Sequence, residues 1–354
     1  MNPLGNHNPD FSALVISLDF ELHWGVRDKC APDGPYRNNL LGARKAIPQI
    51  LDLFEEFHVA ATWATVGFLF AESRHDREKF APAVRPQYTD SRLDAYSEPT
   101  GDGEDDDPLH YGLSLIEQIR SRARQEIATH TFSHYYCLEP GETREAFAAD
   151  LRSAVAIAQR RGIDLRSIVF PRNQLRPGYE ELLREAGIVC YRGNEPNWMY
   201  RPRPRSQETI AVRAPRLLDH YVSLSGPKVV RWDEILQPNG LCNVRSSMFL
   251  RPYSAQRKSL ESARLRRIAG GIRAAAEQRG IFHLWWHPHN FGVQTEQNLQ
   301  FLRSVLQVYS GCRRTHGMLS LSMVDVASLV SNVPDAPGTP HEYANDTSAW
   351  EQVL

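Results

Sequence analysis

Apolar residues recur along this chain in two alternating patterns: short apolar runs, and longer stretches with helical spacing. Residues 13–18 form an apolar run rich in β-branched side chains, which predicts a strand buried on both faces. In residues 42–57 the apolar positions return every three or four residues, which predicts an amphipathic helix. This strand-then-helix unit repeats about seven times along the chain.

The later units follow the same order. Further strands are expected at 59–66, in a short segment that ends at Thr129, and at 167–170, 188–191, 281–286 and 318–322. Further helices are expected at 112–124, 143–161, 178–186, 256–279, 295–314 and 323–331. Repeated units of this kind form a parallel sheet, and seven or eight of them close into a barrel. The pattern therefore predicts an α/β fold, a (β/α) barrel of about seven parallel strands.

The barrel pattern spans residues 11–330, which we interpret as one domain. Residues 72–111 interrupt it with four prolines and the acidic run 102–107, so we expect a long surface insertion there. Residues 331–354 contain three prolines and no periodic pattern, and we expect them to form a C-terminal tail.

Composition narrows the classes of function. The 354 residues are 42% hydrophobic with a net charge of −1, which gives no general signal for binding nucleic acid or an anionic membrane. Two basic clusters, residues 201–205 and 264–267, are interpreted as a loop and an exposed helix face. No stretch approaches the roughly 18 apolar residues that span a bilayer. Five well-separated cysteines and an N-terminus without signal-peptide features favour a cytoplasmic protein, while no pattern predicts an oligomeric state.

Residues capable of chemistry follow the predicted strands. The spacing of His130 and His134 allows two imidazoles to converge on one point, and neutral imidazole is a common ligand of zinc and similar cations. A barrel carries its chemistry at the carboxyl ends of its strands. The residues that follow strands here are Asp19 and Glu21 after the first, His130 and His134 after the third, Arg172 after the fourth, Tyr191 after the fifth and His287 after a late one.

This set predicts a divalent metal site with hydrolytic chemistry. One carboxylate and two histidines leave positions open on a cation for water and substrate, and a second carboxylate can accept a proton from the water. The residues alone leave open which of Asp19 and Glu21 binds the metal. Cys137 is a weaker candidate ligand. His287 is the candidate acid for an amine leaving group, and His289 competes for that role.

Aromatic side chains near the same strand ends suit the faces of sugar rings. Trp24, Trp63, Trp285 and Trp286 all fall there, although core packing is the default interpretation for Trp63 and for at least one of Trp285 and Trp286. We predict that Trp24, Tyr191 and His289 contact the substrate.

Four segments, in this order, resemble the motifs of the polysaccharide deacetylase family (carbohydrate esterase family 4, NodB-homology domains). They are Ser17-Leu-Asp19-Phe-Glu21, His130-Thr-Phe-Ser-His134, Phe170-Pro-Arg172-Asn and Leu284-Trp-Trp-His287. The resemblance implies a distorted (β/α) barrel, a divalent metal that is usually zinc, and removal of N-acetyl groups from amino sugars. It also implies that Asp19 is the base, that Glu21, His130 and His134 are the metal ligands, that His287 is the acid, and that Arg172 orients the base.

Two departures from the family pattern leave other functions open. The first motif reads Asp-x-Glu where many members have adjacent aspartates, and in the third motif the proline precedes Arg172. We therefore retain a hydrolase of a non-sugar amide or ureide, and a glycan-binding barrel without turnover, as alternatives. Glycosidase chemistry from the paired acids is a more remote possibility.

Overall fold

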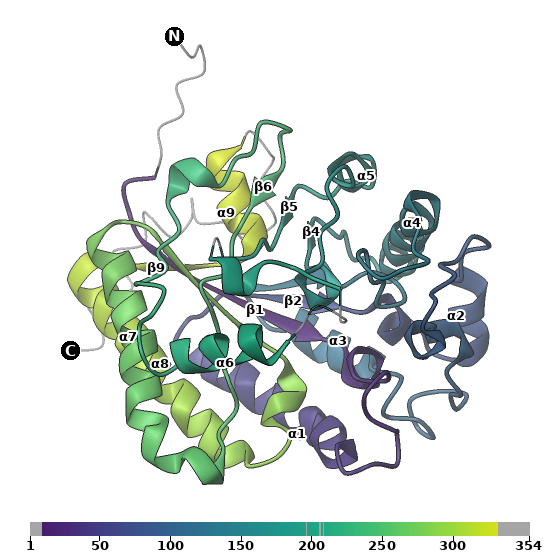
Figure 1. The fold of residues 1–354 in the computed structure, drawn as a ribbon, viewed down its shortest axis with the longest axis horizontal. Helices are drawn as coiled ribbons and strands as arrows, with labels where there is room; N and C mark the ends of the chain where they lie inside the picture. The colour runs from purple at the N-terminus through teal and green to yellow at the C-terminus, as the bar shows by residue number, and fades with distance from the viewer. Residues whose placement is uncertain (1–8, 196, 205–206, 208, 332–354) are drawn as a thin grey trace.

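A computed structural model of the protein describes residues 9–195, 197–204, 207 and 209–331. Its centre is one twisted sheet whose strands all pair in parallel, in the order β6-β5-β4-β3-β2-β1-β8-β7, with β9 also on β1 (Figure 1). The strands are β1 (Ala13–Phe20), β2 (Ala61–Thr65), β3 (Gln125–Thr129), β4 (Ser167–Ile168), β5 (Cys190–Tyr191), β6 (Cys242–Asn243), β7 (Met248–Phe249), β8 (Ile281–Trp286) and β9 (Leu319–Leu321).

Helices cover the outer face of this curved sheet. In Figure 1, α1, α7 and α8 lie along one side of it, and α2, α4 and α5 lie towards the other end. The helices are α1 (Arg37–Glu56), α2 (Arg74–Phe80), α3 (Leu113–Arg120), α4 (Arg144–Arg160), α5 (Glu180–Glu185), α6 (Ile210–Asp219), α7 (Glu261–Glu277), α8 (Thr295–His316) and α9 (Met323–Val330). The predicted distorted α/β barrel is confirmed. No helix in the described ranges has the length and hydrophobicity needed to cross a bilayer.

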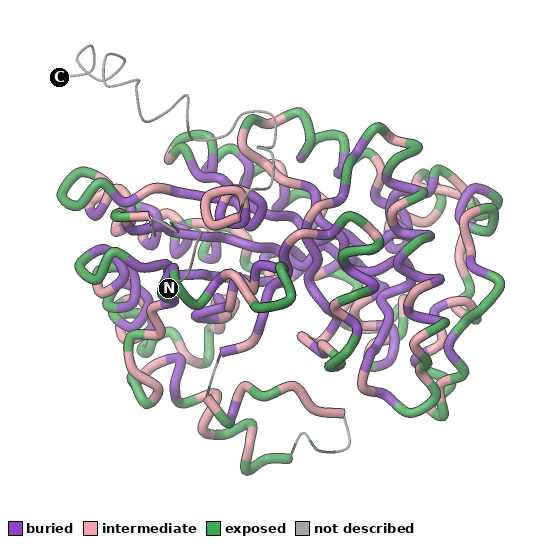
Figure 2. The backbone as a smooth tube through the Cα atoms, turned by 90° about the horizontal axis from the view of Figure 1, so that it is seen from above, coloured by how far each residue is buried: buried purple, intermediate pink, exposed green. Residues whose placement is uncertain are grey.

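Strand β1 is the best-connected strand of the sheet. Residues 13–18 pair with β8 on one side. On the other side residues 13–15 pair with β9 and residues 17–20 pair with β2, for example Asp19 with Ala64. All eight of its residues are buried, as predicted for a strand covered on both faces. Figure 2 shows that buried segments gather in the interior of the molecule and exposed segments lie at its edge. Because side chains alternate along a strand, Asp19 shares the inner face with Ala13 and Val15.

The core is divided by this alternation. Outward-facing residues such as Leu14 and Ile16 pack with the surrounding helices, whereas Ala13 and Val15 pack inside the barrel against α9. Helix α9 begins with a capping box between Ser322 and Asp325. Its first amides donate to Thr62 and Glu126 near the starts of β2 and β3, so it lies at the amino-terminal end of the barrel. The inner face of β1 therefore changes from apolar at that end to polar at the carboxyl end.

Three segments differ from the sequence predictions. Residues 72–111 include helix α2 and buried side chains such as Leu93 and Leu109, so the segment is more ordered than the surface loop we expected. Helix α6 lies within and beyond the stretch expected to be irregular. In the basic cluster 264–267, Arg264 and Arg267 are buried, so the prediction of an exposed helix face was wrong. The C-terminal tail lies outside the described residues from position 332 onwards.

Candidate active site

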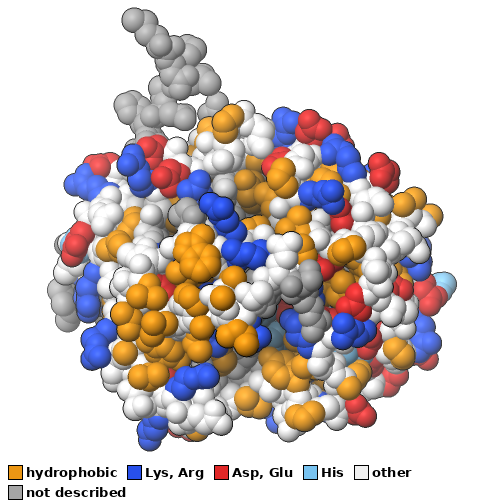
Figure 3. All heavy atoms as spheres, in the orientation of Figure 1, with side chains coloured by type: hydrophobic (Ala, Val, Ile, Leu, Met, Phe, Trp, Pro, Cys, Tyr) orange, Lys and Arg blue, Asp and Glu red, His pale blue; other side chains and the backbone are white. Residues whose placement is uncertain are grey.

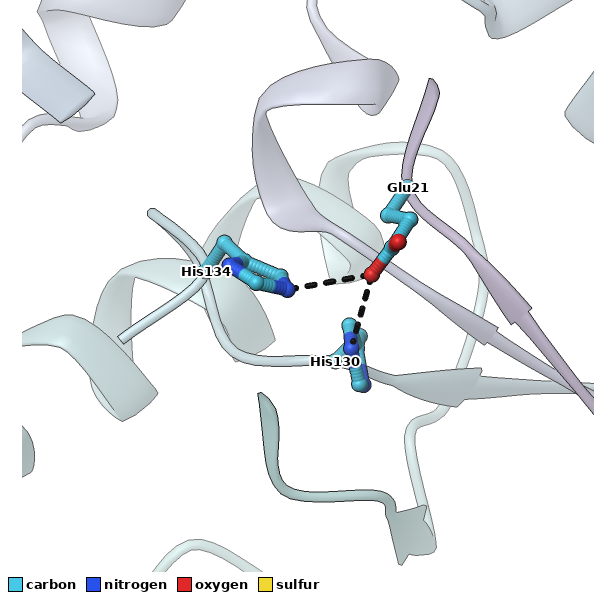
Figure 4. Close-up of side chains that lie close together, drawn as sticks. All are labelled: Glu21, His130 and His134. Atoms are coloured by element: carbon cyan, nitrogen blue, oxygen red, sulfur yellow. Dashed lines mark hydrogen bonds and ion pairs between the residues drawn. The ribbon is translucent and has the colours of Figure 1, made fainter. Parts of the chain in front are cut away.

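Three side chains meet at the carboxyl ends of β1 and β3. Glu21 follows β1, and His130 and His134 follow β3; Oε2 of Glu21 lies 3.0 Å from Nε2 of His134 and 3.4 Å from Nε2 of His130 (Figure 4). All three side chains are buried. The structure thus brings together the three residues predicted as metal ligands.

The chemistry of these donors fits a divalent metal. Nδ1 of His130 lies 2.8 Å from the Val169 carbonyl oxygen, which only accepts, so Nδ1 carries the proton and Nε2 presents a lone pair to Glu21. A lone pair facing a carboxylate is unfavourable unless a cation lies between them. The spacing also agrees, because ligand atoms about 2.1 Å from a tetrahedral zinc lie about 3.4 Å apart.

The segment that carries the histidines is a loop, neither a helical turn nor a strand. Thr131 has φ +64° and His134 has φ +59°, backbone conformations that cost a β-branched or bulky residue roughly 1–2 kcal/mol each. Asp150 on α4 offsets this cost: its carboxylate accepts from the amides of Phe132 (2.7 Å) and Ser133 (3.1 Å) and from the Ser133 hydroxyl. A buried carboxylate on a neighbouring helix therefore sets the geometry of the loop.

Glu21 is held by a different local feature, a single turn of 3-10 helix (Leu22–Gly25) that begins just after it. Its carboxylate folds back over that turn, and a Cβ atom added at Gly25 would lie 1.9 Å from the carboxyl carbon. Only a glycine leaves this space. Burial raises the pKa of Glu21, but the neighbouring His287, His130 and His134 outweigh it, so the pKa lies well below its usual value.

Asp19 lies beside this triad and is paired with Arg192. Nη1 and Nη2 of the guanidinium donate to Oδ1 (2.6 Å) and Oδ2 (2.8 Å) of Asp19 in a bidentate arrangement. Burial raises the pKa of Asp19, but the charge of Arg192 outweighs it and the net shift is downward, so the carboxylate is ionised at neutral pH. Arg192 also donates to Oδ1 of Asn173 (2.9 Å), which fixes the plane of the guanidinium.

His287 follows β8 on the open side of the site. Its Nε2 lies 3.5 Å from Oε1 of Glu21 and 3.8 Å from Oδ2 of Asp19, and its side chain keeps 24% of its surface exposed. His289 is buried behind it, with the two rings stacked at 5.0 Å. Burial lowers the pKa of His289 to about 3, and the charge of His287 adds to the shift. Of the two histidines, only His287 can meet a substrate.

A cavity of roughly 710 Å³ opens above these residues. Trp285 and Phe249 line it with rings 4.7 Å apart. Basic side chains outnumber acids in its wall, and Figure 3 shows basic groups near the middle of the face seen in Figure 1. The acids are Asp19, Glu21 and Glu195, and the bases are Lys29, Arg172, Arg201, Arg203, Arg213, Arg216 and Arg251.

Several predicted site residues lie elsewhere. Arg172 lines the cavity but donates to Asp28 (2.7 Å) and Glu139 (2.9 Å), so the prediction that it orients Asp19 does not agree with the structure. The predicted substrate contacts Trp24, Tyr191 and His289 and the alternative ligand Cys137 are all buried and absent from the cavity wall. Cys137 joins neither group of potential metal ligands found in the described chain.

Arg192 is the residue that the sequence analysis missed. It comes directly after Tyr191, and adjacent residues of a strand point to opposite faces. Tyr191 packs outward against Phe170 at 6.5 Å between ring centroids, while Arg192 reaches into the barrel. The strand end was identified correctly, but the side chain chosen there was on the wrong face.

A solved structure of another protein shares the fold of this chain. No protein-family model and no curated protein sequence matches the chain. Among solved structures, a Mycobacterium smegmatis protein assigned as a polysaccharide deacetylase matches with a TM-score of 0.56 at 13% identity, over 93% of this chain and 96% of that one. The chain therefore has the barrel fold of that protein.

Two more distant structures also match. Puue allantoinase matches with a TM-score of 0.49 at 10% identity, over 93% of each chain. A variant of a CE4-family pseudoenzyme from Bacillus anthracis matches with a TM-score of 0.42 at 10% identity, over 90% of this chain and 68% of that one.

Proposed function

We propose that this protein is a metal-dependent hydrolase that removes N-acetyl groups from an amino sugar. The observation that carries the proposal is the arrangement of Glu21, His130 and His134 beside an ionised Asp19 and a partly exposed His287 at one end of the barrel. The resemblance to polysaccharide deacetylases over four sequence motifs supports the same reaction.

Each residue has a defined task in this reaction. A divalent cation bound here would polarise the amide carbonyl and make water a better nucleophile. Zinc is the cation that we propose, because it commonly binds histidine nitrogens together with a carboxylate oxygen. Asp19 accepts the proton of the attacking water, and Arg192 keeps it ionised and oriented. His287 donates a proton to the amine as the carbon–nitrogen bond breaks. The products are acetate and a free amino sugar.

The cavity favours a substrate that carries negative charge. Seven arginine and lysine side chains line it against three carboxylates, two of which belong to the reaction site itself. Arginine binds phosphate and carboxylate groups through paired hydrogen bonds. An amino sugar linked to a nucleotide or a lipid phosphate, as in precursors of surface polysaccharides, meets this requirement.

The test is acetate release by zinc-loaded protein from a panel of N-acetylated amino sugars, free, phosphorylated and nucleotide-linked. We expect the phosphorylated forms to react fastest, and we expect His130→Ala and Asp19→Asn to lose at least about a hundredfold in kcat/KM. His75→Ala is a matched control, because His75 is an exposed histidine on α2.

The alternatives give different results in the same panel. If the protein hydrolyses a cyclic ureide and none of the sugars, it is a hydrolase of a non-sugar amide or ureide. Tight sugar binding without acetate release by fully zinc-loaded protein would identify a glycan-binding barrel. Release that survives both substitutions would refute the roles given to Asp19 and His130.

A further inference from the structure

A second group of side chains that could bind a metal lies outside the active site. His23, Glu98 and His110 place one ligand atom each within 4.8 Å of the others, and both histidines are buried. His23 comes from the 3-10 turn that follows Glu21. Glu98 and His110 come from the insertion, 75 and more residues further along the chain.

The three ligand atoms form a triangle of the size that a metal requires. Nδ1 of His23 lies 2.9 Å from Nε2 of His110 and 3.5 Å from Oε1 of Glu98, and the third side of the triangle is 3.7 Å. Donors about 2.1 Å from a tetrahedral zinc lie about 3.4 Å apart. A shift of a few tenths of an ångström in each side chain would give this geometry.

In each ring the outer nitrogen, which points away from the cluster, makes a hydrogen bond of the kind seen in known zinc sites. Nε2 of His23 lies 2.9 Å from the Cys30 carbonyl oxygen, and Nδ1 of His110 lies 2.8 Å from Oδ2 of Asp107. Carbonyl and carboxylate oxygens accept hydrogen bonds, so both outer nitrogens carry protons. Histidines that bind metals make this type of contact with their second nitrogen.

When both rings are neutral, two lone pairs face each other. With its proton on the outer nitrogen, each neutral ring presents an unprotonated nitrogen to the other across 2.9 Å, next to the Glu98 carboxylate. Two lone pairs at this distance repel, and a cation between them removes the repulsion. From this geometry we propose that His23, Glu98 and His110 bind a divalent metal ion of the zinc class.

The proposed ion has a structural role, because none of its three ligands lines the cavity. It would join the insertion to the turn that directly follows Glu21. Weaker contacts already link the same parts: the His23 amide donates to the Leu109 carbonyl (3.1 Å), and the Trp24 indole donates to the His110 carbonyl (2.9 Å). A metal bond would add a strong link between segments that are distant in sequence.

A proton is the competing occupant of the same place. Burial lowers the pKa of His110, but Asp107 and Glu98 outweigh it and the net shift is upward, which favours an imidazolium that donates to His23. In that case the group is a buried salt bridge, and a metal ion can bind only by displacing the proton. The two occupants are distinguished by counting metal ions.

The experiment measures zinc per chain in the full-length protein after loading with excess zinc and desalting. We expect about two equivalents in the wild type and about one in His134→Ala, which disables the active-site triad. In the His134→Ala background, Glu98→Gln and His110→Gln are each expected to lose the remaining equivalent and the rise in melting temperature that zinc produces. His75→Gln in that background is the control and retains it.

Two results would overturn the proposal. Folded His134→Ala protein that retains no zinc would assign the cluster to a proton. A remaining equivalent that persists in both Glu98→Gln and His110→Gln would place the ion elsewhere. Glu98 keeps 17% of its side chain exposed, so Glu98→Gln is expected to fold, which circular dichroism verifies. The zinc count does not depend on turnover, so it stands or falls separately from the proposed deacetylase activity.

Discussion

The space beside Gly25 gives the sharpest test of the active-site geometry. A Cβ atom at this position would lie 2.0 Å and 2.3 Å from the two carboxylate oxygens of Glu21, whereas ordinary contact begins at 3.4 Å. In Gly25→Ala the carboxylate must therefore move by about 1.4 Å, which greatly exceeds the roughly 0.2 Å that a metal–ligand bond tolerates.

We expect Gly25→Ala to weaken zinc binding at the active site by at least about tenfold, because one of its three ligands is displaced. Competition with a chelating dye measures the affinity, and kcat/KM for acetate release should fall in parallel. Thermal unfolding shows whether the loss reflects the site alone or the whole fold.

Gly270→Ala is the matched control for this substitution. Gly270 lies within α7, and a Cβ there meets nothing within 4 Å. The change should leave zinc affinity and activity intact and add about 0.5–1 kcal/mol of stability, the usual gain from alanine in a helix. If Gly25→Ala binds zinc and turns over substrate as the wild type does, the assignment of Glu21 as a metal ligand in this position is refuted.

Three further predictions concern the residues around the site. Arg192→Lys should lower kcat at least about tenfold with zinc retained, because lysine cannot make the bidentate contact to Asp19. The neighbouring Tyr191→Phe is the control and should leave kcat/KM within about twofold of the wild type. Equal effects of the two substitutions in steady-state assays would contradict the opposite orientations of these side chains. Phe249→Ala should raise KM between about twofold and tenfold with little change in kcat, as expected for loss of an aromatic contact, and an unchanged KM would remove Phe249 from the substrate site. Burial raises the pKa of Asp150 to about 6 against 3.8 in the unfolded chain, so its contribution to stability is largest at acid pH and declines as pH rises from 4 to 6. In chemical denaturation, the unfolding free energy of the wild type minus that of Asp150→Asn should shrink across that range. A constant difference would show that the pKa is not raised.

The sequence by itself determined the fold class and the positions of the strand ends. Residues 13–16 are apolar on both faces, and such a strand is stable only when it is covered on both sides, as in a parallel sheet with helices around it. Because parallel strands place their carboxyl ends together, a list of the residues after each strand already contained Glu21, His130 and His134. The weak points were the short strands and the small helices. Strands β6 and β7 have two residues each, too few to show a period, and α2 and α6 lie in segments rich in proline or arginine.

Only the tertiary structure decided which side chain at each strand end faces inward. Tyr191 and Arg192 are adjacent, and a shift of one residue in register exchanges their faces, so the sequence cannot choose between them. Long-range packing also decided the partners of Arg172, which lie far along the chain at Asp28 and Glu139. The cluster of His23, Glu98 and His110 had no signal in the sequence, because its members are separated by irregular segments whose path depends on how the insertion packs against the barrel.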